Sequence, residues 1–343
     1  MTLAAGVDIS RRTMILGAAA ASLGGAPASA AQRTIHVANA AGALNLTMAA
    51  FMKRMRFFEA FGLTPDILTV ADGSKMVGGV LNGQVDASFS SGFGQLFPAI
   101  EHGAGLKIIG GGALTPTLAL YSGKPDVRTL KDLEGRTVGT GSPGALVHQL
   151  SVTLLRKYGV DVGKVKFANI GSSADILKAV SVGTVDAGTG ASALIDEAAK
   201  YNVHLVEHGN MSIELRDYPF QGAWTSDRKI RTERDLLVHG LAAQARLYRF
   251  AHTPAARGPF IEARRTVFPN LPDSDHEAEW RFIETYKPFA TGLVLSPERL
   301  AYVQKINVGF GQQAKVLPFA RVADMSLAAD AIKLLARVGQ VSK

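Results

Sequence analysis

The chain has 343 residues, 47% of them hydrophobic and 19% charged, with a formal net charge of +8. This length and apolar content suffice for large cores and favour about two domains. The absence of cysteine excludes a disulfide framework and a thiolate metal site. A basic balance suits nucleic acid, an anionic membrane or an acidic small ligand. Because no nucleic-acid motif and no Lys/Arg block occurs, the charge favours the steering of an anion.

The N-terminal segment predicts an export signal over residues 1–30. Arg11 and Arg12 precede a mildly apolar run, residues 14–26, which is shorter than the ~20 residues that span a bilayer. Small residues at Ala28 and Ala30 match the positions that a signal peptidase reads, so we expect cleavage after Ala30. The arginine pair is typical of a twin-arginine signal, although ordinary secretory signals also carry it. With no cysteine to accept lipid, we expect a mature protein that is free in the periplasm.

A repeated unit is the clearest internal signal. Gly-Gln-Val-Asp-Ala at 83–87 recurs as Gly-Thr-Val-Asp-Ala at 183–187. Before each copy we predict a helix that Ser74 or Ser172 caps and that the first glycine of the motif ends in a left-handed conformation. After each copy we predict a short strand and a loop of small residues, 90–92 and 188–192. This order is a unit of a parallel α/β sheet, so two copies predict two lobes of like architecture.

The remaining pattern agrees with an α/β fold. Alternating or continuous apolar runs predict strands, and glycines or polar clusters separate them from helices. The expected strands are 34–38, 67–70, 106–109 and 118–121, the expected helices are 45–61 and 95–102, and 129–139 is read as a short helix, a turn and a strand.

A further helix is predicted to end at Tyr158. Ser142 is a suitable cap and Pro143 suits the first helical position, while Leu146, Leu150 and Leu154 continue one apolar stripe. Free N–H groups and the helix dipole make such a start an anion site, with a dipole contribution of ~0.3–1 kcal/mol. The alternative is that Ser142 only caps the helix.

Four motifs in order carry a family resemblance. They are 83–87, 105–107 (Gly-Leu-Lys), 130–139 (Leu-Lys-Asp-Leu-Glu-Gly-Arg-Thr-Val-Gly) and 183–187. Over roughly residues 33–265 the chain resembles the nitrate, sulfonate and taurine class of ABC-importer binding proteins. The resemblance implies a type II periplasmic binding fold: two α/β lobes with mixed, largely parallel sheets, joined by two crossover strands near 115–121 and 218–224. Lobe one would be 33–117 and 222–343, with the C-terminal helices packed on it, and lobe two would be 118–221.

Ligands of open α/β sheets bind beyond the carboxyl ends of the strands, which places the site in the small-residue loops and at the helix starts. The expected ligand-binding residues are Asn39, Gly42, Asn45, Gly73, Ser74, Ser91 and Gly92 from lobe one, and Gly141, Ser142, Ser172 and Thr189 from lobe two, with His148 and Trp224 as further candidates. A surface position for His148 and a core position for Trp224 are the alternatives. We interpret Asp86 and Asp186 as buried carboxylates that organise loops, not as a catalytic pair.

Motifs for catalysis are missing from the sequence. It contains no Gly-x-x-x-x-Gly-Lys loop, no His-Glu-x-x-His and no Gly-x-Ser-x-Gly elbow. Enzymes that make the thiamine pyrimidine resemble this fold, but their cysteine-rich motif cannot occur in a chain without cysteine. We therefore predict a non-enzymatic protein without cofactor or metal.

The predicted function is that of a monomeric periplasmic solute-binding component of an ABC transporter, with a permease and an ATPase as partners. By closure of the cleft it would capture a small organic anion, first of all an aliphatic sulfonate such as taurine, or else nitrate or a carboxylate. The alternatives are an exported ligand-sensing receptor for a signalling partner and a binder of a neutral pyrimidine or aromatic compound.

Overall fold

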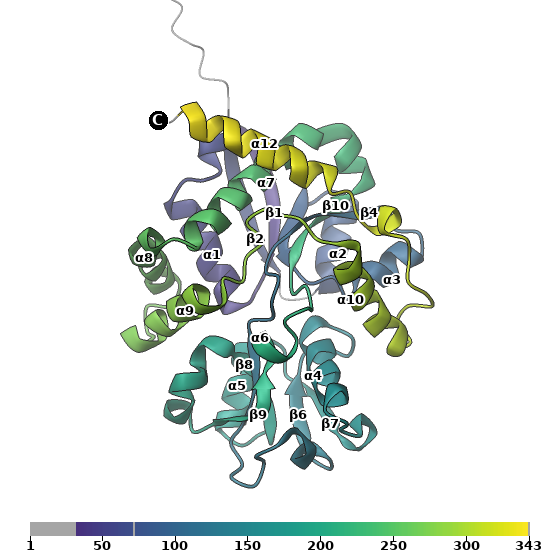
Figure 1. Cartoon of the computed structure of the whole chain (residues 1–343), viewed down its shortest axis with the longest axis vertical. Coiled ribbons are helices and arrows are strands. Elements are labelled where there is room, and N and C mark those ends of the chain that lie inside the picture. Colours follow the sequence, from purple (N-terminus) through teal and green to yellow (C-terminus); the bar gives the residue numbers. More distant parts are fainter. Residues whose placement is uncertain (1–31, 71–72, 342–343) are drawn as a thin grey trace, which may run out of the picture. The chain divides into compact units, whose positions relative to one another are not determined.

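Two mixed sheets of five strands form the framework of this computed structural model, which describes residues 32–70 and 73–341 (Figure 1). The predicted export signal lies outside the described residues. The first sheet has the order β2-β1-β3-β10-β4 and the second the order β7-β6-β8-β5-β9. The strands of the first sheet are β1 (Arg33–Ala40), β2 (Leu63–Val70), β3 (Ala87–Ser91), β4 (Leu106–Gly111) and β10 (Gly222–Ser226). Those of the second are β5 (Leu118–Ser122), β6 (Thr137–Thr140), β7 (Lys166–Asn169), β8 (Ala187–Ala191) and β9 (His204–Asn210).

Strand direction explains why the sheets are mixed. In the first sheet β10 is antiparallel to both of its neighbours, and in the second sheet β5 is antiparallel to both of its neighbours. The remaining strands of each sheet run in one direction, as β1 with β2 and β6 with β7 illustrate. The strand order of the second sheet thus repeats that of the first, which confirms the α/β fold class predicted from the two sequence copies.

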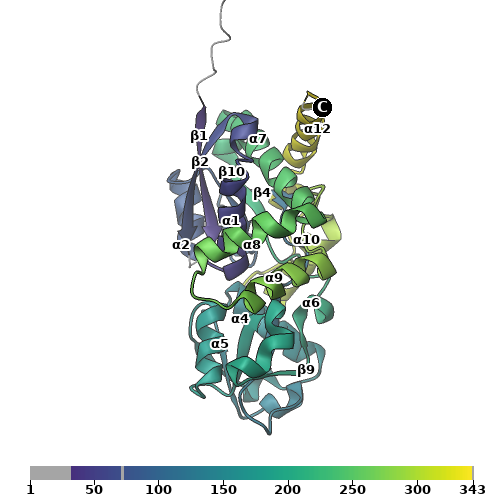
Figure 2. The ribbon, with the colours of Figure 1, turned by 90° about the vertical axis from the view of Figure 1, so that its left-hand side faces the viewer.

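Helices cover both sheets. The longer ones beside the first sheet are α1 (Ala43–Arg54), α2 (Gly73–Asn82), α7 (Asp227–Ala251), α8 (Arg257–Val267), α9 (Asp273–Tyr286), α10 (Pro297–Gly309) and α12 (Ser326–Val341). Those of the second are α4 (Leu146–Lys157), α5 (Ser173–Ser181) and the 3-10 helix η4 (Ser192–Tyr201). Short segments are α3 (Leu96–Glu101), α6 (Met211–Glu214) and α11 (Phe319–Val322). Helix α12 lies along α7 (Figure 1), and α1 packs against α8 (Figure 2). None of the helices within 32–70 and 73–341 combines the length and hydropathy that a membrane crossing requires.

The repeated motif has the same backbone role in both sheets. The Asp86 N–H donates to the His36 carbonyl at 2.7 Å, and the His36 N–H donates back to Asp86 Oδ2 at 2.8 Å. Asp186 makes the same reciprocal pair with Thr137, at 2.9 Å in both directions. Each aspartate therefore ties the start of its strand to the neighbouring strand, which confirms the structural role of both carboxylates. Asp86 is buried as predicted, whereas Asp186 is only half-buried.

The chain crosses between the sheets twice. It leaves the first sheet after β4 to enter β5, and it returns after α6 to enter β10. The two crossing segments pair with each other, because the Gly112 N–H donates to the Gln221 carbonyl at 2.9 Å and the Gln221 N–H donates to the Ala113 carbonyl at 3.0 Å. The two predicted crossovers are therefore present, while the exact lobe boundaries remain a prediction.

The C-terminal helices contact elements of both sheets. Asn307 of α10 accepts a hydrogen bond from Gln149 Nε2 of α4 at 2.5 Å. Arg281 of α9 lies 3.5 Å from Glu197 of η4. Besides covering the first sheet, as the sequence predicted, these helices thus connect it with the second.

The small residues after Asp186 are part of a strand, and the prediction of a loop at 188–192 was wrong. They form β8, which runs to Ala191. A Cβ atom at Gly188 would lie 2.5 Å from Ile176 Cγ2 of α5. The glycine is therefore required for close packing of a helix on the strand, and Ser90 and Ser91 of the first copy likewise belong to β3.

Candidate ligand-binding site

A cavity of about 270 Å³ lies where loops and helix starts of the two sheets meet. Its lining follows strands β1, β3, β6, β7 and β8 at their carboxyl ends and includes both crossing segments. The residues that line it include Gly42, Leu44, Asn45, Gly73, Val77, Ser91, Gly92, Gln95, Thr117, Gly141, Ser142, Ala145, Leu146, Ser172, Ala191, Phe220, Gln221, Trp224 and Glu279. Its volume is just below the ~300–1,000 Å³ of drug-sized ligand pockets, so it suits a small solute.

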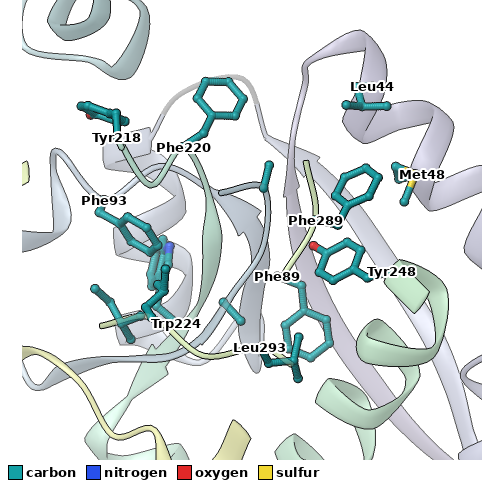
Figure 3. Close-up of a cluster of buried hydrophobic side chains, with 14 of the residues drawn as sticks. Leu44, Met48, Phe89, Phe93, Tyr218, Phe220, Trp224, Tyr248, Phe289 and Leu293 are labelled. Carbon is teal, nitrogen blue, oxygen red and sulfur yellow. The ribbon is translucent and has the colours of Figure 1, made fainter. Parts of the chain in front are cut away.

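Asn45 and Trp224 give the first-sheet side of the cavity its polar and its aromatic component. Asn45 is 7% exposed, and its Oδ1 accepts a hydrogen bond from Ser90 Oγ at 3.1 Å. Among the described residues its Nδ2 has no acceptor, so both amide N–H groups are free to donate to a solute. The Trp224 indole N–H donates to Ser91 Oγ at 2.6 Å, which fixes the ring as a wall. Figure 3 shows Trp224 of β10 and Phe220 of the second crossing segment together with Leu44 of α1.

Four helices of nine residues or more begin at the cavity. Gly42 precedes α1, Gly73 begins α2, Ala145 precedes α4 and Ser172 precedes α5, and all four line the cavity. Ser172 caps its helix as predicted, because its hydroxyl accepts from the Asp175 N–H at 3.2 Å. Helix starts present free N–H groups and the positive end of the dipole, so this lining attracts a negative or strongly polar group.

The start of α4 differs from the prediction. The helix begins at Leu146 after Ala145, so Ser142 is not its cap and Pro143 is not its first residue. Gly144 has φ +78°, a left-handed conformation that a right-handed helix cannot include. Ser142 instead begins the turn that its carbonyl closes with the Ala145 N–H at 2.9 Å, and it still lines the cavity.

Three predicted residues do not line the cavity. Asn39 is buried and donates to the Asn45 carbonyl at 3.0 Å, so it supports Asn45 from behind. Thr189 is fully buried in β8, and its hydroxyl has no partner among the described residues. His148 is half-buried on α4 and accepts from the Gly144 N–H at 3.2 Å. Burial lowers the pKa of His148, which keeps the ring neutral near pH 7.

Ser74 was also predicted as a helix cap. Helix α2 begins at Gly73, so Ser74 lies within the helix and not before it. The Ser74 side chain lies outside the described residues, and its part in the site stays a prediction. The other predicted residues line the cavity: Gly42, Asn45, Gly73, Ser91, Gly92, Gly141, Ser142, Ser172 and Trp224.

Several lining residues were missed by the sequence analysis. They are Leu44, Gln95, Thr117, Leu146, Phe220, Gln221 and Glu279. Gln95 follows the repeated strand closely and Gln221 lies in a predicted crossover, so their positions relative to strand ends could have indicated them. Glu279 comes from α9, far along the chain, and no local pattern marks it.

The charge of the lining is unusual for an anion site. No Lys, Arg or His lines the cavity among the residues that the structure describes. The charged member of this lining is Glu279, 2% exposed, whose Oε2 lies 3.2 Å from Nη2 of the buried Arg264. In the same part of the chain, no group of three or more His, Asp or Glu residues is arranged to hold a metal ion.

This architecture is that of the periplasmic binding proteins, and solved structures agree with it. The alkanesulfonate-binding protein SsuA from Xanthomonas axonopodis pv. citri, bound to MOPS, matches with a TM-score of 0.66 and 16% identity over 87% of this chain and 97% of that one. The periplasmic nitrate-binding protein NrtA from Synechocystis PCC 6803 matches with a TM-score of 0.66 and 12% identity over 88% and 89%. At such identities the likeness shows the fold.

The fold also occurs in an enzyme. The desulfurization enzyme DSZB matches with a TM-score of 0.62 and 12% identity over 88% of this chain and 99% of that one. Most of the similar structures named here are binding proteins. A search among proteins with curated descriptions found no match.

The family is shown by the sequence itself. The model of the NMT1/THI5-like family matches residues 49–253, more than half of the 343 residues. The chain therefore belongs to the NMT1/THI5-like family. The match spans most of both sheets, including both copies of the repeated motif.

Proposed function

We propose that this protein is the solute-binding component of an ABC importer and that it binds a small organic solute in the cavity of about 270 Å³. The observation that carries the proposal is the convergence of four helix starts from both sheets on one cavity. Such starts bind anionic or strongly polar groups. The aromatic and aliphatic lining supplied by Leu44, Phe220 and Trp224 suits an organic body.

The structural neighbours support the transport role. SsuA and NrtA are named as a sulfonate-binding and a nitrate-binding protein. By analogy this chain would be exported through its twin-arginine segment and would deliver its solute to a permease in the membrane. Replacement of Arg11 and Arg12 by lysine tests the export step: we expect the precursor to stay in the cytoplasm, and undiminished export would contradict the twin-arginine route.

A thermal-shift screen tests solute binding. The panel holds sulfonates, carboxylates, nitrate, bicarbonate and pyrimidines, added to the purified protein. A solute present at a hundred times its dissociation constant stabilises the fold by about 2.7 kcal/mol, which raises the melting temperature by several degrees. No shift with any member, from folded and ligand-free protein, would contradict the proposal.

A matched pair of variants locates the binding. Val77 of α2 lines the cavity, whereas Leu81 on the same helix is 41% exposed and does not line it. Val77→Trp should abolish the thermal shift because the larger side chain fills the cavity, and Leu81→Trp should leave it unchanged. Equal effects of the two variants would place the solute elsewhere.

A further inference from the structure

A buried amide of α4 is bonded to the C-terminal part of the chain. Gln149 is fully buried, and its Nε2 donates to Asn307 Oδ1 at 2.5 Å and to Gln312 Oε1 at 2.8 Å. Its Oε1 accepts from the Tyr218 hydroxyl at 3.2 Å. Both N–H groups of this amide are therefore taken up by acceptors of one short stretch, residues 307–312, which we call the latch segment.

The latch segment is fixed to the first-sheet part of the molecule. Asn307 is fully buried, and its Nδ2 donates to the Gly94 carbonyl, in the loop after β3, at 2.8 Å. Just beyond the segment, the Ala314 N–H donates to Glu101 Oε2 at 2.8 Å, at the end of the helix that connects β3 with β4. Because α4 packs beside the second sheet, the hydrogen bonds of Gln149 join the two sheets.

A second contact lies on the same face of α4. Arg156 follows Gln149 by seven residues, about two helical turns. Its Nη1 donates to the Gly309 carbonyl at 3.3 Å, and its guanidinium lies 4.6 Å from the centroid of the Phe310 ring. The latch segment therefore contacts α4 through its first, middle and last residues.

Two glycines permit this close approach. A Cβ atom at Gly94 would collide with the Gln149 amide, and a Cβ atom at Gly144 would collide with the Gln312 amide. Gly94 does not adopt a positive φ, so packing, and not backbone conformation, explains the absence of a side chain there. The chain thus accommodates the contact on both of its sides.

The latch contact borders the cavity without being part of its lining. Leu146, about one turn before Gln149, lines the cavity, and so does Gly94, whereas Gln149, Asn307 and Gln312 do not. Movement of α4 away from the first sheet would therefore open the cavity and would also separate the Gln149 amide from both of its acceptors. A buried amide that loses its partners must bind water instead.

We propose that the latch segment holds α4 against the first sheet independently of the solute and thereby slows the exchange of solute with the cavity. Its contacts stabilise the closed form by the same amount for every solute, because none of them involves the cavity lining. The effect on exchange rests on the proposed function, whereas the holding of α4 does not.

Distance measurements test the holding of α4 without a solute. Because the chain contains no cysteine, Lys166→Cys in β7 and Val316→Cys beyond the latch segment provide two exposed sites for spin labels. In protein freed of solute by unfolding and refolding, we expect one narrow distance distribution, and a longer population once Gln149→Leu or Gln312→Ala is added. An unchanged distribution in these latch variants would overturn the inference, whatever solute the protein binds.

Dissociation rates test the effect on exchange. With 2-aminoethanesulfonate as the first probe, or another solute that shifts the melting temperature, stopped-flow indole fluorescence should show dissociation about tenfold faster in Gln312→Ala, as the loss of one or two hydrogen bonds implies. An unchanged rate would overturn the inference and leave the proposed function intact. Absence of binding by the whole panel would contradict the proposed function and the effect on exchange, while the distances still decide the holding of α4.

Gln304 is the matched control on the same helix. It is 1% exposed, and its Oε1 accepts from Gln313 Nε2 and from the Leu317 N–H, both at 2.7 Å, so these bonds stay within the C-terminal part. Gln304→Leu should lower the melting temperature and leave the distances and the dissociation rate unchanged. If it changes them as the latch variants do, general destabilisation of α10 explains the effect and the inference is overturned. If Gln149→Leu fails to fold, the half-buried Gln312 decides through Gln312→Ala.

Discussion

The two copies of the repeated motif have the same backbone geometry but different surroundings. Asp86 and Asp186 each make a reciprocal pair with a neighbouring strand. Asp86 additionally lies 2.6 Å from Lys229 Nζ, with side-chain exposures of 8% and 19%, whereas no ion pair involves Asp186 among the described residues. The comparison teaches that a local motif determines the connection between strands, and that contacts from distant parts of the chain determine how much the connection contributes to stability.

The largest expected difference between the copies concerns these two carboxylates. Asp86→Ala removes the acceptor for the His36 N–H and leaves the Lys229 ammonium largely buried and unpaired, so we expect a loss of about 3 kcal/mol in the free energy of unfolding. Asp186→Ala removes a charge-assisted hydrogen bond to Thr137 and should cost about 1.5 kcal/mol. Urea denaturation measures both. Equal losses would show that the ion pair to Lys229 contributes nothing.

The second-largest difference in stability between the two copies is expected two residues after each aspartate, at Gly188 and Ser88. Gly188→Ala would place a Cβ atom 2.5 Å from Ile176 Cγ2 and 3.1 Å from the Gly139 carbonyl oxygen, so overpacking should cost about 2 kcal/mol. Ser88 is the equivalent residue in the first copy, and its hydroxyl bonds to Ser91 Oγ at 2.6 Å. Ser88→Ala should cost at most about 1 kcal/mol. Urea denaturation midpoints of the two variants measure these losses. If Gly188→Ala leaves the free energy of unfolding unchanged, α5 can move away from the strand.

A smaller effect is expected where the motif reaches the cavity. Ser91→Ala leaves the Trp224 indole N–H without its acceptor, which should cost about 1.5 kcal/mol of stability. It should also weaken solute binding, because the ring loses its fixed orientation. Ala191 occupies the equivalent position in the second copy, and Ala191→Ser is the control with an expected change within about 0.5 kcal/mol. Indole fluorescence that is unchanged in Ser91→Ala would contradict the assigned contact.

The smallest expected effect has the opposite sign. The Thr189 hydroxyl is fully buried and without a partner among the described residues. Thr189→Val removes an unsatisfied polar group, so the free energy of unfolding should stay constant or rise by up to about 1 kcal/mol. Thermal unfolding of this variant measures the change. A loss above about 1 kcal/mol would reveal a partner for the hydroxyl, such as a buried water molecule.

Much of the fold could be predicted from the sequence because its signals are local and occur twice. Gly83 and Gly183 end their helices with φ +81° and φ +76°, and the aspartates that follow organise both sheets. The predictions failed where two local signals compete. Ser142 and Pro143 are suitable for a helix start, yet the left-handed Gly144 interrupts the chain there, and α4 begins after it.

The site was predicted only in part, for a different reason. Residues at or after strand ends, such as Gly42, Ser91 and Gly141, could be identified because the fold places the strand ends at this cavity. Thr189 was misplaced because glycines that serve close helix packing look like loop glycines in the sequence. Glu279 could not be identified, since only the packing of α9 brings its side chain to the cavity.

The most direct test of the account is a crystal structure of the protein grown with 2-aminoethanesulfonate. We expect electron density for the solute in the cavity, with its sulfonate at the helix starts that Gly42, Ala145 and Ser172 precede. Density for the solute outside this cavity, or a sulfonate directed away from these helix starts in a filled cavity, would contradict the proposed site.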